Sequence, residues 1–159
     1  MQKKPEFLER LYYRYYSNTE ILAAEASLDI NTLSPENLIK SLQSKDLENK
    51  IFEIQNYFNT LAIENENAFH KYLSVVITSN AEKIKRGARR KKTLELALKD
   101  VEIAAKDKND LVNLLSILIG IKPLIVSKDV SSLNNKQSKE ILKWGMKLIL
   151  KGYFESKKE

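Results

Sequence analysis

A regular apolar repeat that begins after Asp46 constrains the fold more than any other feature of this chain. Large apolar side chains recur there at alternating spacings of four and three residues: Leu47, Ile51, Ile54, Phe58 and Leu61. This spacing puts them on one face of an α-helix that packs against other helices at a shallow angle. The same phase continues, so we expect one long helix over residues 46–79, with a break or bend at the polar residues 64–67.

Glycine and proline are scarce, with four and three copies in 159 residues, so few positions favour tight turns. Hydrophobic residues make up 43% of the chain, which is enough for the core of one domain of this length. We therefore expect a mainly α-helical bundle of long antiparallel helices over residues 1–122. Residues 123–159 are expected to form a small α/β appendage, because Leu124–Val126 and Gly152–Phe154 resemble short strands on either side of a predicted helix at 134–151.

Shorter apolar repeats predict further helices in the expected bundle. They cover residues 6–25, 34–44, 81–105 and 111–120, with a polar turn at 107–110. Ser34 and Pro35 form a typical helix start, because a serine hydroxyl can cap the first turn and proline there loses no hydrogen bond.

The first predicted helix carries four of the seven tyrosines, in two adjacent pairs: Tyr12, Tyr13, Tyr15 and Tyr16. Adjacent residues on a helix point in different directions, so all four cannot enter one core. Tyrosine combines an apolar ring with a polar tip and is favoured at boundaries between elements or chains. We predict a subunit interface here, and the alternative of two core and two half-exposed tyrosines stays open.

A basic segment at residues 83–92 is the strongest charge feature. It contains seven cations and no acid: Lys83, Lys85, Arg86, Arg89, Arg90, Lys91 and Lys92. The whole chain has 27 basic and 21 acidic residues, a net charge of +6, and without this segment 20 basic and 21 acidic residues remain. The segment therefore predicts a concentrated positive patch on a nearly neutral protein.

Three interpretations of this patch compete. It is a solvated helix face balanced by acids of neighbouring helices, a contact to nucleic-acid phosphates, or a contact to an acidic protein surface. Three of the five arginines lie in the segment, and arginine is the residue suited to paired hydrogen bonds with carboxylate or phosphate. We therefore predict that its cations contact a partner protein or, weakly, nucleic acid.

Catalytic motifs are not recognisable in the sequence. The chain has no cysteine and a single histidine, His70, and it lacks a glycine-rich phosphate loop, a zinc-protease helix motif and a nucleophile elbow. We expect no enzyme activity, no metal and no cofactor. The longest apolar run, Leu111–Ile121, is interrupted by polar residues and is far shorter than the roughly 20 residues that span a bilayer. We expect a cytoplasmic protein without membrane contact.

One stretch resembles a known family. Arg89–Ala97 is similar to the end of the long central helix of an archaeal GINS subunit, in which an arginine, a lysine three residues later and a Leu-Ala pair recur. Arg89, Lys92, Leu96 and Ala97 occupy those places.

The C-terminal region resembles the small β-rich domain of the same family. Leu124–Val130 is similar to its first strand, and Leu148–Glu155 to the helix end and last strand. The hairpin expected between them is replaced by Ser131–Asn135, which implies a shortened domain.

The resemblance implies a non-catalytic scaffold subunit of the replicative helicase assembly, an oligomer with a sister GINS subunit. It would bridge the MCM helicase and a RecJ-like protein, with the tyrosines and the apolar repeat at subunit interfaces. The alternative function is a helical nucleic-acid-binding module, such as a small subunit of an RNA-guided effector complex or a DNA-binding regulator.

Overall fold

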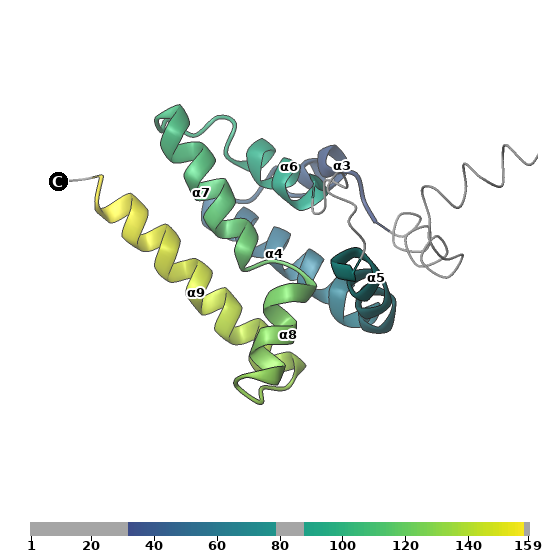
Figure 1. The fold of residues 1–159 in the computed structure, drawn as a ribbon. Helices are drawn as coiled ribbons and strands as arrows, with labels where there is room; N and C mark the ends of the chain where they lie inside the picture. Colours follow the sequence, from purple (N-terminus) through teal and green to yellow (C-terminus); the bar gives the residue numbers. More distant parts are fainter. Residues whose placement is uncertain (1–31, 79–87, 158–159) are drawn as a thin grey trace, which may run out of the picture. The chain divides into compact units, whose positions relative to one another are not determined.

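The described part of the protein is helical throughout. The computed structural model describes residues 32–78 and 88–157, and these residues form helices joined by turns, with no strand among them (Figure 1). The mainly helical class is therefore confirmed. The described helices are α3 (Pro35–Ser41), α4 (Leu47–Glu64), α5 (Glu66–Thr78), α6 (Ala88–Ala97), α7 (Ala105–Ile117), α8 (Ile121–Asp129) and α9 (Asn135–Glu155).

Two compact units divide the chain. One unit, here called the helical body, comprises Leu33–Glu64 and Ile84–Glu159 and contains α3, α4 and α6 to α9. Both sides of the expected boundary at residue 122 belong to it. The other unit comprises Met1–Thr32 and Asn65–Lys83, and its described helix is α5.

The only histidine of the chain, His70, lies on the surface of α5. His70 Nε2 lies 3.7 Å from a carboxylate oxygen of Glu66, one turn earlier on the same helix, and the two side chains are 50% and 30% exposed. An exposed pair of this kind contributes little to stability.

The helix expected over residues 46–79 is interrupted at Asn65, inside the polar stretch where a break was expected. The helix expected over 81–105 ends at Ala97 in its described part, and the polar turn expected at 107–110 is wrong. Those residues form the first turns of α7, where Lys106 Nζ donates to Asp110 Oδ2 across one helical turn at 2.7 Å. A polar stretch with opposite charges four residues apart is compatible with a loop, but the same spacing also stabilises a helix.

The α/β appendage is also wrong within the described residues. Leu124–Val126 lies inside α8, and Gly152–Phe154 lies in the last turns of α9. Three apolar residues in a row suit a strand and a half-buried helix equally, and packing decides between them. In α8 the buried side chains are Ile121, Leu124 and Ser127, which recur every three residues as one helix face does.

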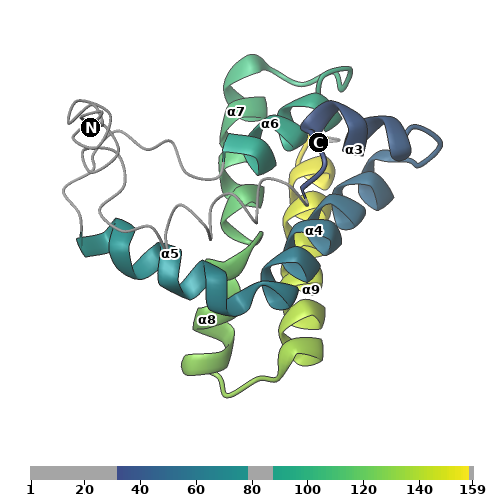
Figure 2. The same ribbon diagram turned by 90° about the vertical axis from the view of Figure 1, so that its right-hand side faces the viewer.

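The core of the helical body forms around α4, which contacts α6, α8 and α9 (Figure 2). The apolar repeat supplies its centre, because Ile51, Ile54 and Phe58 are buried while Leu47 and Leu61 pack at the edge. Helix α3, capped by the Ser34 hydroxyl as expected, packs on α6. The other buried members of this core are Leu38, Leu42, Leu94, Ala97, Leu98, Leu111, Val112, Leu115, Ile119, Met146 and Leu150.

A buried polar cluster holds the turn between α7 and α8. The side-chain amide of Gln55 donates to the carbonyls of Leu118, at 3.1 Å, and Leu142, at 3.0 Å. Leu118 caps the end of α7, and the last carbonyls of a helix have no partner within it, so a buried helix end needs such a donor. Gln55 is 2% exposed, so these bonds form away from solvent.

Two more side chains complete this turn cluster, which we define as Gln55, Asn59, Arg90 and the backbone of residues 118–120. Asn59, 1% exposed, accepts a hydrogen bond from the Gly120 N–H at 2.6 Å. Arg90 Nη1 donates to the Ile119 carbonyl at 2.7 Å. No buried side-chain nitrogen or oxygen among the described residues lacks a partner.

Gly120 is required at this turn for two reasons. Its φ is +92°, in the left-handed region that side chains disfavour, and a Cβ there would lie 2.7 Å from Arg90 Nη1. Gly152, by contrast, lies in α9 with open space where a Cβ would be.

We expect opposite effects from alanine at these two glycines. Gly120→Ala should lower the free energy of unfolding by about 2 kcal/mol or more, because it strains the backbone and displaces Arg90. Gly152→Ala should raise it by about 0.5–1 kcal/mol, because alanine loses less entropy in a helix. Urea denaturation followed by circular dichroism measures both, and equal signs would contradict this account of the turn.

Substituting two asparagines of α4 should show that the turn cluster contributes to stability while the exposed surface of the helix does not. Asn59→Ala leaves the buried Gly120 N–H without its acceptor and should cost about 2–3 kcal/mol of unfolding free energy. Asn56→Ala, three residues earlier at an exposed position, should change it by less than about 0.5 kcal/mol. Denaturant midpoints and slopes check both variants, and a small loss in Asn59→Ala would show that the bond to Gly120 is dispensable.

Candidate interaction surface

The predicted basic patch is only partly described, and its described cations differ in exposure. Arg89 to Lys92 occupy the first turns of α6, with Lys92 exposed and Arg89 and Lys91 half-buried. Lys83, Lys85 and Arg86 lie outside the described residues, as do the four tyrosines predicted at an interface: Tyr12, Tyr13, Tyr15 and Tyr16.

Arg90 has a structural role inside the helical body. Its guanidinium lies against the Ile119 carbonyl at the end of α7, where the helix dipole favours a positive charge. Burial lowers the pKa of Arg90 from its ordinary value, since desolvation disfavours the charged form. One of the three arginines that suggested a partner contact is thus used to hold a turn.

A second basic region lies on α8 and α9, and reasoning from the sequence missed it. Residues 121–157 contain eight lysines and three carboxylates. The signal was present, because lysines recur along α9 at spacings of three or four residues: Lys136, Lys139, Lys143, Lys147 and Lys151. Such spacing gathers charges on one side of a helix.

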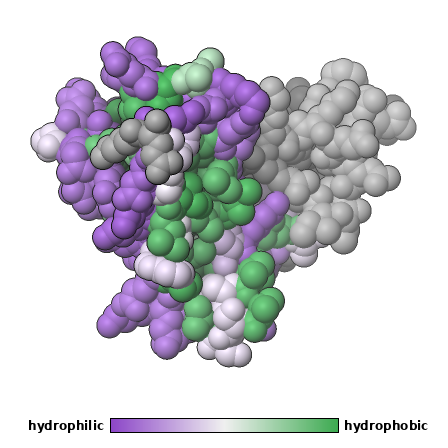
Figure 3. All heavy atoms as spheres, turned by 90° about the vertical axis from the view of Figure 1, so that its left-hand side faces the viewer, coloured by the Kyte–Doolittle hydropathy of each residue, from purple (hydrophilic) through white to green (hydrophobic). Residues whose placement is uncertain are grey.

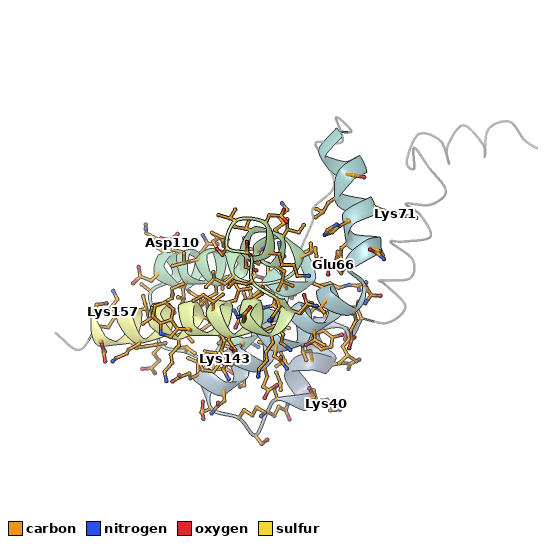
Figure 4. The ribbon with its side chains drawn as sticks, turned by 90° about the horizontal axis from the view of Figure 1, so that it is seen from below. Lys40, Glu66, Lys71, Asp110, Lys143 and Lys157 are labelled. Atoms are coloured by element: carbon orange, nitrogen blue, oxygen red, sulfur yellow. The ribbon has the colours of Figure 1, made fainter. Side chains whose placement is uncertain are left out.

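This lysine row belongs to the side of α9 that faces α4. Lys139 Nζ donates to the Thr60 hydroxyl at 2.8 Å, and Lys143 Nζ lies 5.1 Å from the centre of the Phe52 ring (Figure 4). A polar groove of about 500 Å³ runs between the two helices, lined by lysine, glutamate and amide side chains and by Phe52.

The side of α9 next to the lysine row is apolar and open. Ile141, Trp144 and Leu148 follow one another at spacings of three and four, and Trp144 is the only tryptophan of the chain. Helix α7 adds two exposed apolar side chains, Leu114 and Ile117. These five residues, between 44% and 65% exposed, are called the apolar face below.

Contacts at both ends align α7 and α9 as antiparallel neighbours. Near one end, Asp107 Oδ2 accepts from the Tyr153 hydroxyl at 3.3 Å and lies 2.8 Å from Lys157 Nζ. Near the other end, the Leu118 side chain lies 3.6 Å from where a Cβ of Gly145 would be. This register sets the apolar residues of α7 along the part of α9 that holds Trp144 and Leu148.

The space-filling view shows a hydrophobic band on one side of the molecule (Figure 3). Hydrophilic atoms border the band on one side. With about 200 Å² for a whole side chain of this size, the five residues expose roughly 500 Å² of apolar surface. That is at the upper end for the largest patch of an ordinary monomer, and such patches mark interaction sites.

Residues suited to bond-making chemistry do not gather in the described ranges. No three acidic or histidine side chains there come close enough to hold a metal ion. Several carboxylates of α7 and α9 pair with lysines, as Asp110 does with Lys106 and Glu155 with Lys151.

Comparisons with known proteins identify no relative. No family model, no curated protein and no solved structure matches the chain. The resemblance to a GINS subunit therefore stays a prediction from the sequence.

No single helix in the described residues is long and apolar enough to cross a membrane. Helices α7 and α8 reach the length only as a pair, and they meet at 50°. Leu111 and Leu115 of α7 are buried in the core of the helical body. The cytoplasmic location stays a prediction.

Acid should weaken the link between α7 and α9. The Lys157 ammonium lowers the pKa of Asp107 by hydrogen bond and charge, and the Tyr153 hydroxyl adds to this. A carboxyl with a lowered folded pKa stabilises the fold above its unfolded pKa of about 3.9, and this contribution disappears as the pH falls through the folded value.

Asp107→Asn should therefore lower the urea midpoint at pH 7, with a difference from wild type that shrinks as the pH falls below about 4. The control is Asp129→Asn, an exposed carboxylate of α8 with no ion pair to another described residue. Unfolding curves over a pH series measure both. A difference that grows on acidification would contradict the role assigned to Asp107.

Proposed function

We propose that this protein is a non-catalytic helical subunit that docks onto another protein through the apolar face. The observation that supports this is the open apolar surface of α7 and α9, which includes the only tryptophan. Tryptophan is among the residues most often responsible for binding energy at protein interfaces. Leaving such a surface in water is costly, so its retention favours a partner.

The helical body does not need the apolar face for its own core. The buried core forms from α3, α4, α6, α7 and α9 without any of the five exposed residues. At about 25 cal/mol per Å², covering roughly 500 Å² of apolar surface releases on the order of 10 kcal/mol before the costs of association. This is enough to support a specific complex once flanking residues add their contacts.

The chemistry of the face favours a protein over nucleic acid. Its five residues are uncharged, and the lysine row lies towards α4, where Lys139 and Lys143 already contact Thr60 and Phe52. Nucleic-acid binding relies on cations that meet phosphates directly, so it requires charge at the centre of the surface. The lysine row keeps a nucleic-acid-binding module as the second candidate function.

A GINS-type scaffold in the DNA-replication helicase assembly is one specific form of this proposal. Its support is the resemblance of Arg89–Ala97, which belongs to α6. The segments matched to strands of the family's small domain, Leu124–Val130 and Leu148–Glu155, are mostly helical, so that half of the resemblance no longer supports it. A sister GINS subunit, the MCM helicase and a RecJ-like protein are the partners to look for.

Affinity capture from lysate of the source cells tests the proposed function. We expect the tagged wild-type chain to retain a defined set of proteins, and Trp144→Ser or Ile117→Ser to lose it, because each removes a large part of the apolar face. Val130→Ser is the matched control, since Val130 is an exposed apolar residue at the C-cap of α8 and is not one of the five residues of the apolar face. Mass spectrometry identifies the retained proteins, and circular dichroism verifies that the variants fold.

Two results would count against this function. Retention that is the same in wild type and Trp144→Ser would remove the apolar face from it. Retention that disappears after nuclease treatment would favour the nucleic-acid-binding alternative. Recovery of replication-fork helicase components would support the GINS-type form, and a retained set without them would argue against that form alone.

A further inference from the structure

We infer that the partner seated on the apolar face is an acidic amphipathic helix of another protein. This inference rests on the proposed function and adds the chemistry of the partner. It follows from the shape of the face, from the charged side chains that border it and from the lysines among them that form no ion pair with a described residue.

The shape of the face suits one helix. Helices α7 and α9 run antiparallel (Figure 1). The Asp107–Tyr153 contact and the Gln55 link between Leu118 and Leu142 enclose four of the five residues of the apolar face, and Ile141 lies one residue beyond. On α9, Ile141, Trp144 and Leu148 cover two turns, about 10 Å of helix axis. An amphipathic helix presents anchors at positions i, i+3 or i+4 and i+7, which match this length.

The charge beside the face on α9 is mainly positive. Lys143 and Lys147 directly precede Trp144 and Leu148 in the sequence, so they lie one residue around the helix from the apolar row, and the exposed Glu140 lies in the same way before Ile141. Lys147 forms no ion pair with another described residue, and Lys143 lies over the Phe52 ring without a carboxylate among the described residues. Both ammonium groups can therefore form ion pairs with carboxylates of a partner.

The α7 side of the face offers little opposing charge. Its nearest exposed acid, Asp110, already pairs with Lys106 at 2.7 Å (Figure 4). Carboxylates that flank the apolar stripe of a partner helix would thus meet the lysines of α9 without competing with a free acid on α7. Such rim charges speed association and select partners more than they add affinity.

A second copy of this chain fits the face less well. It would bring its own α8 and α9, with eight lysines against three carboxylates in residues 121–157, towards an equally basic surface. Like charges across an interface repel. The charge balance therefore favours a partner of opposite sign.

Fluorescence anisotropy with designed peptides tests the inference on the full-length protein. The probe is a labelled helical peptide of roughly 18 residues, with leucines at i, i+3, i+4 and i+7 and glutamates on both flanks. One control peptide has lysine in place of each glutamate, and a second has serine in place of each leucine. We expect the glutamate peptide to bind at least about tenfold more tightly than either control.

Variants of the chain should change this binding in a defined order. Trp144→Ser should weaken it by about 30-fold, which is the effect of losing a central anchor. Lys143→Glu with Lys147→Glu should weaken it by about tenfold at low ionic strength and less at high salt, where charges are screened. Val130→Ser should leave it unchanged, because Val130 lies outside the face.

Several outcomes would overturn the inference. Equal binding of the glutamate and lysine peptides would remove the acidic character of the partner. Binding to vesicles with phosphatidylserine but to no peptide would assign the face to a membrane surface, and Trp144-dependent self-association without peptide binding would assign it to a second copy. If peptide binding fails while lysate capture still depends on Trp144, the proposed function stands and only the acidic helix is lost. If both fail, both are lost.

Discussion

The helical body depends on a small set of hydrogen bonds at the turn between α7 and α8. Gln55, Asn59 and Arg90 bring their polar groups to three consecutive backbone positions, residues 118–120, at the end of one helix and the start of the next. Each such bond adds only about 1 kcal/mol to stability, but an unpaired buried group costs more than that. The turn is therefore stable only in the presence of α4 and α6, which supply the side chains.

The same hydrogen bonds position the candidate interaction surface. The Gln55 amide joins the Leu118 carbonyl of the turn after α7 to the Leu142 carbonyl of α9, and so fixes one helix relative to the other. Asp107 with Tyr153 and Lys157 fixes their far ends. Because both ends are fixed, the exposed apolar residues between them face solvent together. An interaction surface is thus created by polar contacts that lie outside it.

Much of the fold could be predicted from sequence, because its signals are local. The four-three repeat identified Ile51, Ile54 and Phe58 as core, and the cap at Ser34 started a helix where expected. The predicted strand at Leu124–Val126 failed because three apolar residues carry no period, so packing on α9 and α4 decides their structure.

The candidate site was harder to predict, because it depends on the direction in which each side chain points in the fold. A charge count treats Arg90 like its neighbours, although its guanidinium turns towards the Ile119 carbonyl. The available signal was Gln55 and Asn59, polar residues one turn apart on the buried side of an apolar helix, which usually mark a hydrogen-bonded network. In α9, Ile141 stands beside Leu142, and only the fold shows that the first is exposed and the second buried.

Net charge hid an uneven distribution. Without residues 83–92 the chain is almost neutral, yet residues 121–157 hold eight lysines and three acids. The whole chain has 27 basic and 21 acidic residues, so setting both segments aside leaves 12 basic and 18 acidic residues. The balance is therefore between regions of opposite sign rather than between neighbours. In α9 the lysines towards α4 help to attach the helix, while the apolar row next to them is left open, so one helix serves both the fold and an interaction.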